Sequence, residues 1–205
     1  MHIGIAGNIG SGKTTLTGML AEHYGWEARY EAVSYNPYLE DYYNDIPRWS
    51  YNLETYFLTQ RFRDVLEIAG SDKVIVQDRT IMEGVHIFVA NNHALGNLSD
   101  RDYRTYMQLY DLLISTVKLP DLLIYLKSSV PHLVDSIKRR GRDYEQSISL
   151  EYLAGLNARY EEWIASYEGP LLTVDVDNLD FKTRPEDFEQ ITNRIDAQLF
   201  GLFSK

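Results

Sequence analysis

A glycine-rich segment near the start of the chain constrains the possible fold more than any other feature. Residues 7–14 have the sequence GNIGSGKT, which matches the pattern G-x-x-x-x-G-K-[ST]. The segment follows an apolar run at 2–6 that predicts a strand, and it precedes a helical stretch at 14–24. In this context the pattern is typical of a loop whose backbone N–H groups and helix N-terminus surround phosphate groups. The alternative, a tight turn that binds nothing, is disfavoured by the flanking strand and helix.

The loop predicts binding of a nucleoside triphosphate. Lys13 would reach the β- and γ-phosphates, and Thr14 would hold Mg²⁺. The chain contains no Asn-Lys pair, so it lacks the N-K-x-D segment that GTPases use to recognise guanine. A small kinase is therefore the expected class, with a second substrate still to be placed. The residues expected to contact the nucleotide here are Gly7, Asn8, Ile9, Gly10, Ser11, Gly12, Lys13, Thr14 and Thr15.

Short apolar runs alternate with longer helical stretches along the rest of the chain. This order predicts an α/β protein with a three-layer P-loop NTPase fold, in which helices flank a five-stranded parallel sheet. We expect one domain over residues 1–205, without repeats or linkers. The expected strands are 2–6, 27–30, 73–78, 121–126 and 170–176. The expected helices are 14–24, 49–69, about 83–92, 100–117, about 130–140, 149–167 and about 185–199.

The net charge limits the kinds of partner that the protein is expected to bind. The net charge is 20 − 30 = −10, which argues against non-specific binding to nucleic acid or to an anionic membrane. The absence of cysteine, of a signal peptide and of a long apolar run favours a cytoplasmic protein. An acidic protein that binds phosphate needs a local cluster of basic residues, and this chain has one between 138 and 142. We expect a lid at about 138–148 that brings Arg140 and Arg142 onto the phosphates, although a solvated cationic helix end explains the same residues.

Three charged residues follow predicted strands. Glu31 ends the second strand, and Asp78 and Arg79 end the third. Because ligands of parallel α/β sheets bind beyond the carboxyl ends of the strands, these side chains are expected to meet. Glu31 would be the base for a substrate hydroxyl, Asp78 would hold Mg²⁺ and Arg79 would bridge the base and the transferred phosphoryl group. Taken singly, each is more often a helix cap or a solvated loop residue.

The sequence resembles the deoxynucleoside kinases over nearly its whole length. The resemblance rests on GNIGSGKT, on the segments at 31–33 (EAV), 48–50 (RWS) and 78–80 (DRT), and above all on RGRDYEQ (140–146) followed by LEYL (150–153). It implies that ATP is the phosphate donor, that Mg²⁺ is required and that a deoxynucleoside is the acceptor.

The resemblance also implies individual roles. Tyr43 and Glu145 would bind the 3′-hydroxyl of the sugar, and Phe88 would stack on the base. Val33, Leu39, Leu53 and Phe57 would line the same pocket. The loop 175–181, including Asp177, would hold the adenine of ATP. The family also implies a homodimer, for which Tyr106, Leu109, Tyr110 and Leu113 form a candidate face, although a buried core face has the same pattern.

Three positions depart from the family pattern. Ser136 stands where relatives carry a third lid arginine. Gly84 replaces an aspartate that works with an arginine matching Arg61. Glu54 replaces a glutamine that recognises the base.

Glu54 is therefore the residue on which the substrate prediction depends. Helical periodicity places it on one face with Phe57 and Arg61, although an unpaired charge on an apolar face is costly. A carboxylate only accepts hydrogen bonds, and guanine presents two donors, N1–H and N2–H₂, so the hypothesis is a preference for deoxyguanosine. The alternative is an ion pair of Glu54 with Arg61, which would give a broader purine preference.

The expected activity is ATP-dependent phosphorylation of the 5′-hydroxyl of a deoxynucleoside, most favourably a purine, in nucleotide salvage. A thymidylate kinase-like nucleoside monophosphate kinase is the alternative enzyme. A nucleotide-binding regulatory subunit without catalysis is the alternative outside enzymes.

Overall fold

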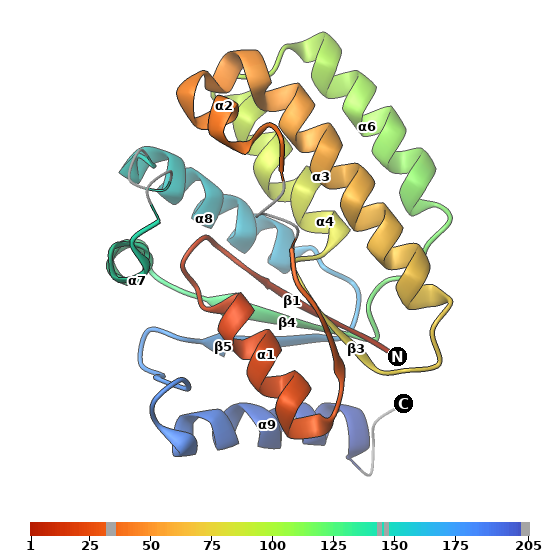
Figure 1. Cartoon of the computed structure of the whole chain (residues 1–205), viewed down its shortest axis with the longest axis vertical. Coiled ribbons are helices and arrows are strands. Elements are labelled where there is room, and N and C mark those ends of the chain that lie inside the picture. Colours follow the sequence, from red (N-terminus) through yellow and green to blue (C-terminus); the bar gives the residue numbers. More distant parts are fainter. Residues whose placement is uncertain (32–35, 143–144, 146–147, 202–205) are drawn as a thin grey trace.

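The computed structural model describes residues 1–31, 36–142, 145 and 148–201. Its centre is a parallel sheet in the order β2-β3-β1-β4-β5 (Figure 1). The strands are β1 (His2–Gly7), β2 (Glu27–Arg29), β3 (Ile75–Asp78), β4 (Leu122–Lys127) and β5 (Leu171–Asp175). This confirms the five-stranded parallel sheet flanked by helices that the alternating pattern predicts.

Helices cover both faces of the sheet, which explains why the central strands are apolar throughout. On one face, α1 (Lys13–Tyr24) and α9 (Pro185–Phe200) pack against Ile3, Ile5 and Val174. The other face carries the remaining helices. These are α2 (Leu39–Asn44), α3 (Ile46–Ala69), α4 (Ile81–Glu83), the π-helix η1 (Gly84–Val89), α5 (Ala90–Ala94), α6 (Asp100–Ile114), α7 (Val130–Arg140) and α8 (Leu150–Ala165).

The strand register brings the predicted charged residues to one edge. Ile5 of β1 is paired with Asp78 at the end of β3, and β1 continues to Gly7, where the glycine-rich loop begins. Glu31 follows two residues after β2, which lies on the other side of β3. The carboxyl edge of the sheet is therefore where a ligand site is expected.

Several helix boundaries follow from their capping residues. The side chain of Ser99 accepts a hydrogen bond from the Asp102 N–H at the start of α6. α3 begins at Ile46 rather than at 49, because Asp45 caps it and a proline occupies its first turn. Gly141 ends α7 with a positive φ of 67°, a conformation that glycine adopts without strain.

Two elements were not predicted from the sequence. The six-residue helix α2 is too short to show a helical period. The helix expected at about 83–92 is instead a run from α4 through η1 to α5, and it includes six residues with π-helical hydrogen bonding. Such π segments are rare and are often found at functional sites.

The face proposed for a dimer belongs partly to the core. Tyr106 and Tyr110 of α6 are buried among residues of α3 and α8, while Leu109 and Leu113 pack against the same cluster. The two tyrosines therefore follow the core alternative. No helix among residues 1–31, 36–142 and 148–201 is long and apolar enough to span a membrane.

Candidate active site

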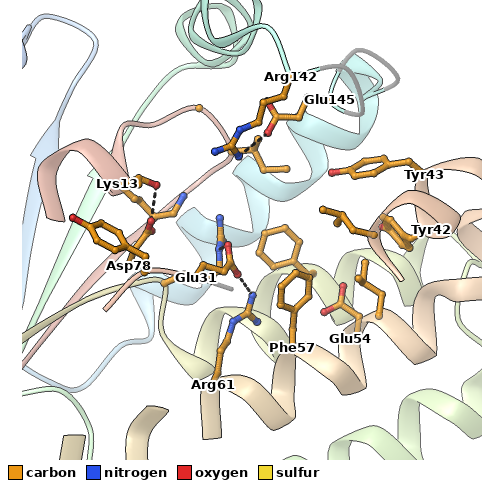
Figure 2. A pocket seen from close by; sticks show the side chains of 18 of the residues that line it. Lys13, Glu31, Tyr42, Tyr43, Glu54, Phe57, Arg61, Asp78, Arg142 and Glu145 are labelled. Atoms are coloured by element: carbon orange, nitrogen blue, oxygen red, sulfur yellow. Dashed lines mark hydrogen bonds and ion pairs between the residues drawn. The ribbon is translucent and has the colours of Figure 1, made fainter. Parts of the chain in front are cut away.

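Two cavities adjoin at the carboxyl edge of the sheet. The first, of about 280 Å³, is enclosed by the strand ends, α2, α3, η1 and the region after α7 (Figure 2). It contains all the predicted substrate residues that the structure describes. These are Glu31, Leu39, Tyr43, Leu53, Glu54, Phe57, Arg61, Arg79, Phe88 and Glu145. Val33, predicted for the same pocket, lies outside the described residues.

The second cavity, of about 630 Å³, lies over the glycine-rich loop. Its lining includes most of the predicted nucleotide contacts, namely Gly10, Ser11, Gly12, Lys13, Thr14, Thr15, Arg140 and Asp177. Ile9 lines the first cavity instead. Gly7 and Asn8 line neither, and the Asn8 side chain donates to the Leu153 carbonyl oxygen of α8 at 3.1 Å. Asn8 therefore anchors the loop to α8.

The glycines of the loop are required by close packing as well as by backbone conformation. Gly10 has a φ of 89°, and a Cβ there would lie 2.9 Å from the Leu133 carbonyl oxygen of α7. Gly12 has a φ of 95°, and its Cβ would lie 2.9 Å from the ring of Phe181. A side chain at either position would displace the elements that enclose the second cavity.

Lys13 is folded back onto its own loop. Its Nζ donates to the carbonyl oxygens of Gly7 (2.8 Å) and Asn8 (3.0 Å). Burial, together with the nearby Arg79 guanidinium, lowers the pKa of Lys13 to about 8. A phosphate group in this position would stabilise the ammonium form and raise the pKa again.

Thr14 and Asp78 form an oxygen pair suited to Mg²⁺. The Thr14 hydroxyl donates to Asp78 Oδ2 at 2.5 Å, while Asp78 Oδ1 is buried and has no hydrogen-bond partner among the described residues. Mg²⁺ prefers hard oxygen ligands and commonly takes one or two carboxylates together with waters and phosphate oxygens. The unpaired oxygen beside a hydroxyl therefore fits the ion. No group of three or more His, Cys, Asp or Glu side chains in the described part of the chain could hold a metal by itself.

Glu31 lies between two arginines in the lining of the first cavity. Its Oε1 accepts from Arg61 Nη2, and its Oε2 accepts from Arg79 Nε at 3.1 Å. Burial alone would raise the pKa of Glu31, but Arg79 and Arg61 outweigh it and hold the pKa at about 2. The carboxylate is thus ionised at neutral pH, and it can accept a hydrogen bond from a hydroxyl.

Arg79 is fixed by a buried carboxylate that the sequence analysis missed. Glu83 is 0% exposed and accepts from Arg79 Nη1 (3.3 Å), the Gly7 N–H (3.3 Å), the Thr80 N–H (2.7 Å) and the Tyr160 hydroxyl (2.7 Å). The Tyr160 hydroxyl is also 2.9 Å from Arg79 Nη1. Glu83 therefore joins the glycine-rich loop, Arg79 and α8. The T-x-x-E spacing of Thr80 and Glu83, a capping-box pattern, was the available signal.

The arginines after α7 are paired with Glu145. Arg140 donates to both carboxylate oxygens, at 3.0 and 2.6 Å, and Arg142 lies 3.5 Å from one of them. Arg140 and Arg142 line both cavities, as the lid prediction requires. Arg139 instead donates to Ser136 at 3.1 Å, on the side of the second cavity. Residues 143–144 and 146–147 of the predicted lid lie outside the described residues.

Asp177 lines the second cavity and also accepts hydrogen bonds from a neighbouring turn. Its Oδ1 accepts from the Ser128 hydroxyl at 3.0 Å and from the Ser129 N–H at 2.9 Å. These bonds tie the loop after β5 to the turn between β4 and α7. Asp177 therefore shapes the region predicted to hold adenine.

One end of the first cavity is apolar and aromatic. Leu39, Leu53, Phe57 and Phe88 line it, and the Arg79 guanidinium lies 4.6 Å from the centre of the Phe88 ring. Three further tyrosines, Tyr30, Tyr42 and Tyr152, line the cavity and were missed by the sequence analysis. Tyr42 lies on α2, which was itself not predicted.

Glu54 lies in this aromatic end without a cation in contact. Within 4 Å it has no ion-pair partner among the described residues, and its Oε1 accepts only a long 3.4 Å hydrogen bond from Asn92 Nδ2. The proposed ion pair with Arg61 is not formed, because Arg61 is bound to Glu31. Gly84 leaves room for this arrangement, since a Cβ there would lie 2.8 Å from Arg61 Nη1.

The glycine-rich loop, the sheet order and the two cavities define a P-loop phosphotransferase. The family model described as "Deoxynucleoside kinase" matches residues 3–200, and the chain belongs to that family. It is an enzyme of the kinase class. Membership of this family argues for a nucleoside, rather than a nucleoside monophosphate, as the phosphate acceptor.

Two curated relatives from Bacillus subtilis (strain 168) are similarly close. A deoxyadenosine/deoxycytidine kinase is 36% identical over 196 residues, covering 94% of this chain and 90% of the relative. A deoxyguanosine kinase is 36% identical over 198 residues, covering 94% and 95%. A solved structure of deoxyadenosine kinase from M. mycoides with bound dATP is 35% identical, with a TM-score of 0.85 over 96% of this chain and 100% of that chain. Overall sequence identity to these relatives therefore does not indicate which nucleobase this chain prefers.

Proposed function

We propose that this protein transfers the γ-phosphoryl group of ATP to the 5′-hydroxyl of a purine deoxynucleoside, with Mg²⁺ bound by Thr14 and Asp78. The position of Glu31 is the observation that carries the proposal. It lines the cavity with the aromatic end together with Lys13 and Thr14, which also line the cavity over the phosphate loop. A nucleoside whose base lies between Phe57 and Phe88 would have its 5′ end toward Glu31.

The ionised Glu31 carboxylate accepts the hydrogen bond of the 5′-hydroxyl and takes its proton as the phosphoryl group is transferred. Phosphoryl transfer depends mainly on positioning and charge stabilisation, so a weakly basic carboxylate is adequate. Lys13, Arg79, Arg140 and Arg142 supply positive charge around the transferred group. Mg²⁺, when bound, would neutralise charge on the phosphate oxygens.

Tyr43 and Glu145 complete the sugar site in this proposal. Both line the first cavity, and Figure 2 shows them above Glu54. Glu145 would exchange part of its contact with Arg140 and Arg142 for the 3′-hydroxyl. The two arginines would then turn to the phosphates of ATP.

Glu54 supports the purine assignment, because it is the one carboxyl group beside the aromatic end of the cavity in the part of the chain that the structure describes. As a carboxylate it would accept from guanine N1–H and N2–H₂, which makes deoxyguanosine the favoured substrate of the ionised form. Sites that bind such donors reject bases lacking them by large factors.

A phosphate-transfer assay with purified protein tests the proposal. Deoxyguanosine, deoxyadenosine, deoxycytidine, thymidine and dTMP are offered separately with ATP and Mg²⁺. The expected result is 5′-monophosphate from the purine deoxynucleosides. Phosphorylation of dTMP alone would support the thymidylate kinase alternative, and ATP binding without any transfer would support a regulatory subunit.

The proposal includes a homodimer and a cytoplasmic location. On α6, Leu112 is 68% exposed, which supports an additional contact surface on that helix. Light scattering of the purified protein tests the assembly, and a monomer at micromolar concentration would exclude it.

A further inference from the structure

Glu83 is a buried carboxylate to which the proposed reaction assigns no part. It is 0% exposed and lines neither of the two cavities. Its Oε1 accepts from the Gly7 N–H, Arg79 Nη1 and the Tyr160 hydroxyl, and its Oε2 accepts from the N–H and the hydroxyl of Thr80. A carboxylate has about four acceptor sites, so these donors leave none for a substrate. Any effect of Glu83 on the reaction must therefore pass through its neighbours.

The π-helical segment brings Glu83 and an aromatic ring to the same arginine. Glu83 ends α4, and Phe88 lies in η1, five residues later. At about 100° per residue, an α-helix would place two residues with this spacing roughly 140° apart around its axis. The wider turn of a π-helix, with its i→i+5 hydrogen bonds, brings them closer to one face. The Glu83 carboxylate accordingly lies 3.3 Å from Arg79 Nη1, and the Phe88 ring centre lies 4.6 Å from the Arg79 guanidinium carbon.

The guanidinium nitrogens of Arg79 have separate partners. Nε donates to Glu31 Oε2 at 3.1 Å, and Nη1 donates to Glu83 Oε1 and to the Tyr160 hydroxyl. Among the residues that the structure describes, none accepts a hydrogen bond from Nη2. Because a guanidinium group is planar and its donors have fixed directions, holding Nε and Nη1 also sets the direction of Nη2. Nη2 is therefore the nitrogen left for an oxygen of the transferred phosphoryl group.

Glu83 also contacts the start of the glycine-rich loop. The Gly7 N–H donates to Glu83 at 3.3 Å, while the Gly7 carbonyl oxygen accepts from Lys13 Nζ at 2.8 Å. A bound triphosphate would draw Lys13 toward its β- and γ-phosphates, and the bond to Glu83 would remain. One carboxylate thus holds Arg79 and the loop in fixed relative positions.

Building on the proposed function, we propose that Glu83 is a positioning residue for phosphoryl transfer. It holds the Arg79 guanidinium so that Nε contacts Glu31 and Nη2 is directed to the transferred group. The same contact stabilises the uncommon backbone conformation of Arg79, whose φ is 72°. Without the Glu83 carboxylate the guanidinium would rotate about its side-chain bonds, and its charge would be misplaced relative to the phosphoryl group.

Steady-state kinetics of Glu83→Gln provides the main test. The amide keeps the size of the side chain but removes the charge and replaces one acceptor oxygen with a donor. We expect kcat to fall by about 10²-fold, and KM for the deoxynucleoside to stay within about threefold of the wild type. Glu161→Gln is the matched control, because Glu161 also accepts from a tyrosine hydroxyl, that of Tyr125 at 3.0 Å, and its kcat should not change. An unchanged kcat in folded Glu83→Gln would overturn the inference.

A double-mutant cycle separates positioning from a purely structural role. Tyr160→Phe weakens the same assembly and should lower kcat a few-fold in the wild-type background, but it should have no further effect in Glu83→Gln. Equal fractional losses in the two backgrounds would contradict a shared action through Arg79. If Glu83→Gln does not fold, Tyr160→Phe alone decides, and an unchanged kcat in that variant would overturn the inference.

NMR of protein labelled with ¹⁵N-arginine provides a readout that does not require turnover. The Arg79 Nε–H resonance is assigned by its absence in Arg79→Lys. In Glu83→Gln its exchange with solvent should become faster by at least about tenfold, because the guanidinium is no longer held. Equal exchange in the two proteins would overturn the inference. Failure of the wild type to phosphorylate any deoxynucleoside would refute the proposed function separately, since the exchange measurement does not depend on it.

Discussion

Two carboxyl groups in the lining of one cavity, Glu31 and Glu54, show how strongly local neighbours control ionisation. Glu31 contacts two arginines, which hold its pKa at about 2, although burial alone would raise it. Burial dominates at Glu54, which none of the described cations contacts, and raises the pKa to about 8. The residue type is the same, so the difference arises from where Arg61 and Arg79 place their donors. One end of the cavity is thus built for a permanent charge and the other for a group that changes its charge.

Removing the charge of Glu31 should have the largest effect on activity. Glu31→Gln keeps the shape of the side chain but does not accept the proton of the 5′-hydroxyl. We expect kcat to fall by roughly 10²–10⁴-fold. Steady-state kinetics, with circular dichroism as the check on folding, measures this. An unchanged kcat would show that Glu31 is not the base.

The same two groups should affect stability in opposite pH ranges. Glu31 has a folded pKa below its ordinary value, so its stabilisation is complete above pH 4.5 and is lost as the pH falls toward 2. Glu54 has a folded pKa above its ordinary value, so the free energy of unfolding should decrease as the pH rises from 4.5 toward 8. The decrease should be on the order of a few kcal/mol.

Urea unfolding of wild type and Glu54→Gln between pH 5 and 8 measures that decrease. The variant should lose most of the pH dependence, because its amide does not titrate. Equal pH dependence in the two proteins would mean that Glu54 is already ionised at neutral pH. Glu67→Gln, which removes an exposed carboxylate of the same helix, should behave as the wild type.

A charge introduced beside Glu54 sharpens the comparison further. Asn92→Asp replaces the hydrogen-bond donor that the described residues offer to the Glu54 carboxyl with a like charge, which raises the pKa of Glu54. The decrease in the free energy of unfolding should therefore continue to a higher pH than in the wild type. Urea unfolding between pH 5 and 9 measures where the decrease ends. An end of the decrease at a lower pH than in the wild type would contradict the assignment of this pH dependence to Glu54.

The smallest expected effect concerns the support of Arg79. Tyr160→Phe removes a hydroxyl bonded to Glu83 and Arg79, at a cost of about 1 kcal/mol in stability. Tyr125→Phe is the matched control, because Tyr125 stacks on Tyr160 but bonds Glu161 instead. Only the Tyr160 variant should lower kcat, by a few-fold, with KM for the nucleoside unchanged. Equal kcat in both variants would assign Tyr160 a purely structural role.

The sequence predicted the parts of the site that local patterns specify. GNIGSGKT is a contiguous motif, and Glu31, Asp78 and Arg79 follow apolar strands, so their shared edge follows from the fold. Helical periodicity also placed Glu54 correctly on the inner face of α3.

The contacts among these residues did not follow from the sequence. Arg61 lies on the same face of α3 as Glu54, but it forms its ion pair with Glu31. That pairing depends on the path of the backbone, which no local sequence pattern encodes. Glu83 and Tyr160 are 77 positions apart, and only the packing of α8 against η1 brings α8 close to Glu83. Tyr42 was hidden in a helix of six residues.

Arg79 has a φ of 72°, and it is the one non-glycine residue in the described part of the chain with a positive value. A side chain in this region of backbone space costs on the order of 1–3 kcal/mol, which glycine would not incur. The site retains an arginine there because its guanidinium contacts Glu31, Glu83 and Tyr160. Local backbone preference and activity therefore oppose each other at this position. Selection for thermal stability alone would therefore favour glycine at position 79, whereas the proposed reaction needs the arginine.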